Sequence, residues 1–158
     1  MKAAVDAWVE EPLLRFVRDA RVRLALVLEA SGRVLAQHGF TRSVDVMSAC
    51  ALAAAIQASS AELGRQLDGA PFGSLHHDGS DRQLFLGAIT TPGGLHLLLA
   101  VFDDATSIGL VRLYFGELRG RLAAAAPARV ASDAVTPALD EHFERDLDLN
   151  LARLFGRL

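Results

Sequence analysis

The stretch AVFDDATSIGLVRLYF, residues 100–115, contains the junction that decides how this chain folds. An apolar run typical of a β-strand stops at Asp103 and Asp104, and apolar residues then recur every three or four positions, the period of an amphipathic helix. Two adjacent carboxylates here have three explanations: a metal site, a catalytic pair or a helix start. Carboxylates interact favourably with the free N–H groups of a helix N-terminus, and no third ligand stands nearby at a metal-binding spacing. We therefore expect a helix start, capped by Thr106 or Ser107.

The rest of the chain divides into further helices and strands. Turn sequences such as DGSDR and TPGG separate the later strands. The expected helices are residues 5–20, 43–67 and a third starting near 106, and the expected strands are residues 22–29, 33–40, 72–78, 82–91 and 95–103. Two strands followed by three predict an α+β fold: one five-stranded antiparallel sheet with helices on its faces, in the order α-β-β-α-β-β-β-α.

Local features refine this expectation. Residues 22–29 are apolar at both even and odd positions, which is typical of a central strand. Pro12 lies inside the first helix and predicts a kink or a late helix start. Ser43 or Asp45 can cap the long second helix by accepting backbone N–H bonds.

Composition excludes several classes of protein. The chain has 158 residues, 51% of them hydrophobic, and a net charge of −3, so it lacks the basic excess of a nucleic-acid-binding protein. Cys50 is the single cysteine and lies in an apolar helical context, where an inert buried thiol is expected. The N-terminal residues reach acidic positions too early for a signal peptide, and no uninterrupted apolar run is long enough to span a bilayer. These features are typical of a soluble cytoplasmic protein.

No motif of an enzyme or a cofactor site stands in the sequence. His76 and His77 are consecutive on an expected strand and point to opposite faces, so they do not chelate one ion together within that strand. A metal shared across a dimer edge is the alternative to surface histidines. The glycine-bearing turns lack a following Lys-Ser/Thr, and the serines stand in no G-x-S-x-G elbow. We expect neither catalysis nor a bound cofactor or metal.

The remaining candidates for function are surfaces that could bind another protein. A short-stranded sheet has edges that must be covered or paired, and the Ala-rich helix 43–67 lets another backbone approach closely. We expect a domain over residues 1–126, a linker over 127–138 and an amphipathic C-terminal helix over 139–158. The apolar stripe of that helix docks either on this domain or on a second protein.

Two stretches resemble the Roadblock/LC7 family, and within it the bacterial regulators of cell polarity and gliding motility. They are DARVRLALVLEASGRVLAQHG, residues 19–39, and FDDATSIGLVRLYF, residues 102–115. The likeness covers residues 5–125 well and the tail loosely. The chain departs from the family at Ala54, Ala55 and Ile56, where a small–Gly–Asn step is frequent. The resemblance implies an α/β/α sandwich of the Roadblock/LC7 type.

The resemblance also implies partners. Family members form homodimers through the third strand, which places Phe72, Ser74 and His76 at the dimer edge. The bacterial regulators bind one Ras-like small GTPase in its GTP form, two chains to one GTPase, and accelerate hydrolysis by ordering the GTPase's own catalytic residues. The positions implied for the GTPase contact are Ala53, Ile56, Gln57 and Ser60, and those for docking of the tail are Phe143, Leu147, Leu151 and Leu154. Some members concentrate at a cell pole.

Three hypotheses of the function follow. The first is a homodimeric GTPase-activating regulator, in which Arg33, Arg42 and Arg65 are solvated charges and no arginine is inserted into the GTPase. The second is a Roadblock scaffold or adaptor that dimerises or heterodimerises without stimulating hydrolysis, which the change at Ala55 and Ile56 favours. The third is a small-molecule sensor, which needs a roomy pocket with convergent polar groups.

Overall fold

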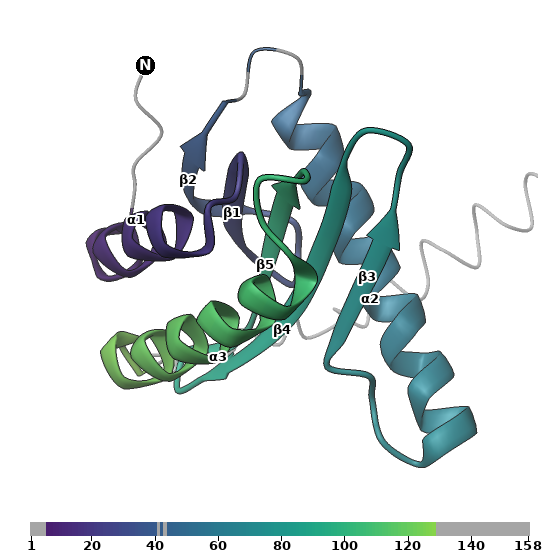
Figure 1. Ribbon diagram of the computed structural model, residues 1–158. Helices are drawn as coiled ribbons and strands as arrows, with labels where there is room; N and C mark the ends of the chain where they lie inside the picture. The colour runs from purple at the N-terminus through teal and green to yellow at the C-terminus, as the bar shows by residue number, and fades with distance from the viewer. Residues whose placement is uncertain (1–5, 41, 43, 129–158) are drawn as a thin grey trace, which may run out of the picture. The chain divides into compact units, whose positions relative to one another are not determined.

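The described part of the computed structural model, residues 6–40, 42 and 44–128, forms three helices and five strands in the predicted order (Figure 1). The elements are α1 (Ala7–Ala20), β1 (Leu24–Glu29), β2 (Val34–Gly39), α2 (Val46–Asp68), β3 (Ser74–Asp78), β4 (Gln83–Thr91), β5 (Gly94–Phe102) and α3 (Ile108–Ala125). The α+β prediction is confirmed. The expected C-terminal helix, and most of the expected linker, lie outside the described residues.

The strands form one antiparallel sheet in the order β2-β1-β5-β4-β3. β1 pairs with β5, for example Val27 with Leu98, and the predicted central strand is confirmed. β4 pairs with β5 along its whole length, whereas β3 covers only the first part of β4, from Gln83 to Gly87. β2 and β3 are therefore the edge strands.

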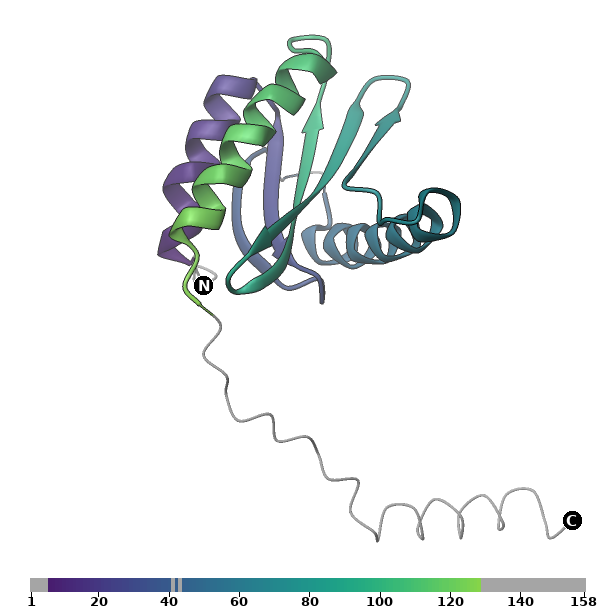
Figure 2. The same cartoon turned by 90° about the horizontal axis from the view of Figure 1, so that it is seen from below.

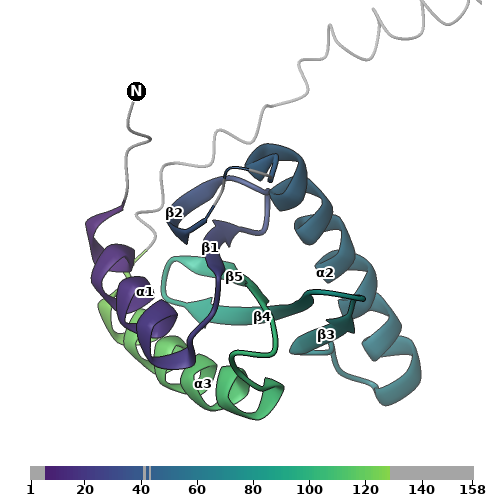
Figure 3. The ribbon, with the colours of Figure 1, turned by 45° about the horizontal axis from the view of Figure 1, so that its top comes forward.

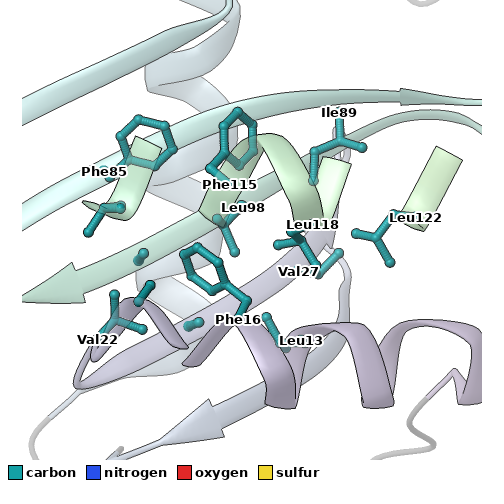
Figure 4. Close-up of a cluster of buried hydrophobic side chains, with 14 of the residues drawn as sticks. Leu13, Phe16, Val22, Val27, Phe85, Ile89, Leu98, Phe115, Leu118 and Leu122 are labelled. Carbon is teal, nitrogen blue, oxygen red and sulfur yellow. The ribbon is translucent and has the colours of Figure 1, made fainter. Parts of the chain in front are cut away.

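Helices cover both faces of the sheet. α1 and α3 lie side by side on one face, and α2 crosses the other (Figures 2 and 3). Alternation along each strand sends every second side chain to each face, which gives two apolar cores. The larger core, under α1 and α3, includes Leu13, Phe16, Val22, Val27, Phe85, Ile89, Leu98, Phe115, Leu118 and Leu122 (Figure 4).

The predicted seam of α3 supplies much of this core. Val111, Phe115, Leu118 and Leu122 are buried, and Ile108 packs against them. The ring of Phe115 stands edge-on to Phe85, with the ring centroids 5.0 Å apart. This arrangement is favourable for aromatic pairs because the positive ring edge meets the negative ring face.

The second core lies between the sheet and α2. Leucines from β1, β4 and β5 form its floor, and Cys50 and Ala53 of α2 are buried against them. Burial raises the pKa of the Cys50 thiol, which agrees with the inert thiol expected from the sequence.

The helix starts follow from side-chain caps. Asp45 caps α2 by accepting from the backbone N–H of Ser48 at 3.2 Å. Ser107 caps α3 by accepting from the backbone N–H of Leu110 at 3.3 Å, whereas the Thr106 hydroxyl is buried with no partner in the described part of the chain. The late start predicted from Pro12 is wrong, because α1 already begins at Ala7 and carries Pro12 inside it.

α2 is unusually apolar for a helix with one covered side. Among the described helices it is the one long and apolar enough to cross a membrane, by length and composition alone. A single helix of this kind is weak evidence for a span, and α2 packs one side on the sheet. Only 17% of its most apolar window is buried, however, so most of its apolar surface has no cover within the described part of this chain.

Candidate interaction surface

β3 presents a free edge of the sheet. Its residues Ser74–Asp78 pair with β4 on one side only. On the other side its alternate N–H and C=O groups have no strand partner in the described part of the chain, which makes this edge a template for pairing with another chain. Ser74 is exposed there.

The two histidines of β3 have different surroundings. His77 is exposed, and His76 points to the opposite face. The His76 ring stacks on Phe102 at 6.0 Å between centroids, and its Nε2 atom lies 2.8 Å from the Gln83 side-chain oxygen. His76 is therefore only partly exposed, because it packs against the sheet of its own chain.

Phe72 precedes β3 rather than forming part of it. The chain turns from α2 to the sheet here, and the half-buried Phe72 lies against Gly64 of α2, where a Cβ atom would stand 2.5 Å from the Phe72 backbone nitrogen. The Gln57 amide donates to the Phe72 carbonyl at 3.4 Å. Phe72 thus fastens the α2–β3 connection, two residues before the strand starts at Ser74.

The four α2 positions implied for GTPase contact do not share one exposed face. Ala53 and Gln57 are buried against the sheet, with exposed fractions of 3% and 5%. Ile56 is exposed, and Ser60 is half-buried. Of this set, Ile56 and Ser60 remain accessible to a partner.

Sequence reasoning missed a second set of residues on α2. Leu52, Ile56, Leu63 and Leu67 are large, apolar and exposed, and their spacing of four, seven and four places them on one side of the helix. We call these residues the apolar stripe. The same spacing stands in the sequence, but small apolar residues all around α2 hide it.

The apolar stripe continues onto β3. A shallow groove of about 410 Å³ runs along α2 and is lined by Leu52, Ile56, Leu63 and the neighbouring side chains, with Leu75 of β3 on its other wall. The last turns of α2 extend past β3 at the edge of the sheet (Figures 1 and 2). A free strand edge and an uncovered apolar helix side thus form one surface.

Asp103 is held by hydrogen bonds within its own chain. Asp103 accepts from the backbone N–H of Ala105 at 3.0 Å and from Arg23 Nε at 2.7 Å. These two bonds hold the pKa of the Asp103 carboxyl below its usual range, the backbone bond contributing most. Asp103 therefore orders the turn before α3 and ties it to the start of β1, in keeping with the predicted helix start. Within residues 6–40, 42 and 44–128, no three His, Cys, Asp or Glu side chains gather as a metal site.

Two of the three arginines named above are engaged within the chain. Arg33 forms a two-bond pair with Glu29, at 2.7 and 3.0 Å, which raises the pKa of the Arg33 guanidinium and lowers that of the Glu29 carboxyl. Arg65 pairs with Glu62 at 2.9 Å, and Arg42 is exposed. All three are surface charges. The tail positions Phe143, Leu147, Leu151 and Leu154 lie outside the described residues.

Comparison with known proteins agrees with this fold. The family model of the Roadblock/LC7 domain matches residues 9–103. One similar solved structure is MglB of Myxococcus xanthus, with 24% identity over 75% of this chain and 90% of that chain and a TM-score of 0.65. A second is the gliding protein MglB of Thermus thermophilus, with 27% identity over 73% of this chain and 86% of that chain and a TM-score of 0.64. A third is an MglB with a tetrameric arrangement, with 26% identity over 80% of this chain and 92% of that chain and a TM-score of 0.67. No curated protein matches the sequence. The chain belongs to the Roadblock/LC7 family.

Proposed function

We propose that this protein is a homodimeric regulator of the MglB kind, which accelerates GTP hydrolysis by an MglA-like Ras-type small GTPase. The observation that carries the proposal is the continuity of the apolar stripe of α2 with the free edge of β3. The similarity to MglB structures at 26 and 27% identity supports it. Roadblock/LC7 domains are typically adaptors or regulators without catalysis of their own.

A second copy of the chain fits this surface. An edge strand offers backbone donors and acceptors that a second β3 satisfies in antiparallel pairing, with Ser74 and His76 near the contact. The same approach brings together the ends of the two apolar stripes that carry Leu63 and Leu67, which removes these leucines from water and leaves Ile56 outside the dimer contact. An interface between identical chains repeats each contact about a two-fold axis, so one stripe and one edge per chain suffice.

The proposed mechanism requires no catalytic group from this chain. Phosphoryl transfer from GTP depends on positioning of the attacking water and on charge stabilisation, and most of that machinery belongs to the GTPase. A partner that binds the competent arrangement of the switch loops more tightly raises its population and hence the rate. Ile56 and Ser60 of α2 are the accessible contact residues, and the tail contributes Phe143, Leu147, Leu151 and Leu154 to the GTPase surface.

A second candidate function is a scaffold that binds its partners without changing hydrolysis. The residues that favour it are Ala54, Ala55 and Ile56, where the family's small–Gly–Asn step is absent. Ala55 and Ile56 are exposed, so this departure alters a surface rather than the core. A changed contact surface is compatible with binding that leaves the switch loops as they are.

The deciding experiment follows phosphate release from the GTP-loaded, Ras-like GTPase of the same organism, with and without the full chain. We expect faster hydrolysis and a two-to-one complex with a GTP analogue on size exclusion. Ile56→Asp removes the acceleration, whereas Leu14→Asp, a matched change on an exposed leucine of α1, leaves it intact. Binding without acceleration establishes the scaffold instead, and absence of binding in both nucleotide states rejects a GTPase partner.

The tail is tested in the same assay. Deletion of residues 139–158 is expected to weaken the complex while the dimer persists. A fluorescent fusion of the full chain then reports whether the protein concentrates at a cell pole.

A further inference from the structure

A second groove lies at the other end of the β3–β4 pair. Its volume is about 690 Å³, and its lining comes from both faces of the sheet: Gln57 and Arg65 of α2, Phe72 of the connection, Thr90 of β4, and Gly116 and Arg119 of α3. We call it the edge groove. Its lining shares no residue with β3 or with the apolar stripe.

The floor of the edge groove is a strand edge without a partner strand. β3 pairs with β4 only as far as Ser74 with Gly87, and Ala88 donates a last bond to the Gly73 carbonyl at 2.8 Å. The chain then leaves the sheet for α2, while β4 continues to Thr91. Backbone groups alternate in direction along a strand, so the N–H and C=O of Thr90 point the same way as those of Ala88, into the groove. No described strand pairs with Thr90 on that side.

The charges of the groove have one sign. Among its lining residues only Arg65 and Arg119 are charged, one on each helical wall. Arg65 has an exposed partner in Glu62, whereas Arg119 lies over the Phe115 ring at 5.7 Å and forms no ion pair within residues 6–40, 42 and 44–128. An occupant that carries carboxylates meets a guanidinium from either wall.

The wall formed by α3 has room for a backbone. Gly116 lines the groove, and a Cβ atom added to it would meet nothing within 4 Å. The gap between α3 and the edge of β4 is therefore open to a main chain rather than filled by side chains from the described part of this protein. Phe72 and Leu95 supply apolar contact on the side of α2.

We propose that the edge groove binds an extended acidic peptide of a partner protein, added as a short strand along Thr90 of β4. Strand addition satisfies the free N–H and C=O of Thr90, and carboxylates on two successive residues, whose side chains point to opposite faces of the sheet, reach Arg65 and Arg119. A strand is favoured over a helix because the groove is centred on a sheet edge that needs main-chain partners. The proposal is independent of GTPase regulation and of the dimer.

The test uses the full-length protein and a fluorescein-labelled hexapeptide of valine with two adjacent central glutamates, which point to opposite faces of an added strand. Saturable binding is expected by fluorescence anisotropy, and the amide of Thr90 gains protection from hydrogen exchange in NMR spectra. A valine–lysine hexapeptide of the same length binds at least ten-fold more weakly, because two attractive contacts become repulsive. Backbone N-methylation of alternate residues, which removes the donors facing β4, abolishes binding.

Protein variants identify the site. The double variant R65E/R119E is expected to lose about ten-fold or more in affinity, whereas R112E, the same change on an exposed α3 residue outside the groove, is expected to match the wild type. Circular dichroism and sedimentation velocity check that each variant is folded and keeps its oligomeric state.

Several results overturn the proposal. They are equal binding of the valine–glutamate peptide by R65E/R119E, equal binding of the two hexapeptides, unchanged Thr90 exchange in the bound state, and no saturation up to about 1 mM peptide. If R65E/R119E instead dissociates the protein, the groove is occupied by a second copy of the chain. Equal affinity for N-acetylglutamate amide identifies a small-carboxylate site and rejects strand addition.

Discussion

The ring of Phe115 on α3 lies directly on the backbone of Gly87 in β4. A Cβ atom at residue 87 would stand 2.4 Å from the ring atom Cζ, far inside van der Waals contact. The Phe115 ring also packs edge-on against Phe85, which lies two residues before Gly87 on β4. The missing side chain at Gly87 therefore lets α3 pack closely on the sheet.

Gly87→Ala is expected to destabilise the fold by about 1–3 kcal/mol, because the added methyl group forces Phe115 out of its packed position. Urea denaturation measures the change. Gly116→Ala is the matched control on the exposed side of α3, where nothing stands within 4 Å, and it is expected to stabilise by about 0.5–1 kcal/mol through helix propensity. Equal effects of the two changes would contradict this packing.

Arg21→Gly is expected to raise the melting temperature. Arg21 ends α1 in the left-handed region with a φ of 56°, a conformation that costs about 1–2 kcal/mol for a residue with a Cβ atom and little for glycine. Differential scanning calorimetry measures the gain. Arg18→Gly, one turn earlier inside α1, lowers the melting temperature, and a rise with both variants would show that loss of positive charge is the cause.

Ser107→Ala is expected to cost about 1 kcal/mol, because the backbone N–H of Leu110 loses the hydroxyl that caps α3. Chemical denaturation of the variant and the wild type gives the difference. Ser107→Asp keeps a hydrogen-bond acceptor at the same position and is expected to retain the stability that Ser107→Ala loses. If Ser107→Ala did not change the free energy of unfolding, the Ser107 hydroxyl would not be the cap that stabilises α3.

The Asp103 carboxylate is expected to make stability depend on pH. Its pKa is lowered in the folded state, first by the backbone N–H of Ala105 and then by Arg23. A lowered folded pKa means a contribution that is present above the unfolded value of about 3.9 and lost as the pH falls through the folded value. Asp103→Asn therefore loses stability at pH 7, and the difference from wild type disappears in acid.

Asp104→Asn is the control for this experiment, since Asp104 accepts no side-chain hydrogen bond in the described part of the chain. Urea midpoints measured from neutral to acidic pH give both comparisons. A gap between Asp103→Asn and the wild type that stays constant in acid would rule out the carboxylate as its source.

Leu63→Asp is expected to weaken self-association by about ten-fold or more, because it places a charge in the apolar stripe that the second copy covers. Sedimentation velocity over a concentration series measures the effect. Leu14→Asp is the control, because Leu14 lies on α1 at the opposite face of the sheet and is 52% exposed, against 51% for Leu63. This variant is expected to leave self-association unchanged. If Leu63→Asp self-associates as strongly as the wild type, the apolar stripe is not part of the dimer interface.

Much of the fold is predictable from local signals. The turn DGSDR and the alternation around it predict the β3–β4 hairpin, and the seam of α3 with Ser107 before it predicts the last helix to within two residues of its start near 106. The late helix start expected from Pro12 is wrong, since α1 begins at Ala7 and includes the buried Pro12. The stacking of His76 on Phe102 could not be predicted locally, because it depends on the pairing of three strands.

The sequence by itself determined the order of the elements and the interior place of β1, because periodicity, turn residues and caps act between near neighbours. Only the tertiary structure decided which side of α2 faces the sheet. A helix with apolar and small residues all around carries no period that singles out Ala53 and Gln57 as buried or Leu63 as exposed. Phe115 contacts Gly87, although the two residues are far apart in the chain. Arg65 and Arg119, which are also far apart in the chain, line one groove at the end of β4. Such contacts are products of close packing, and no local pattern encodes them.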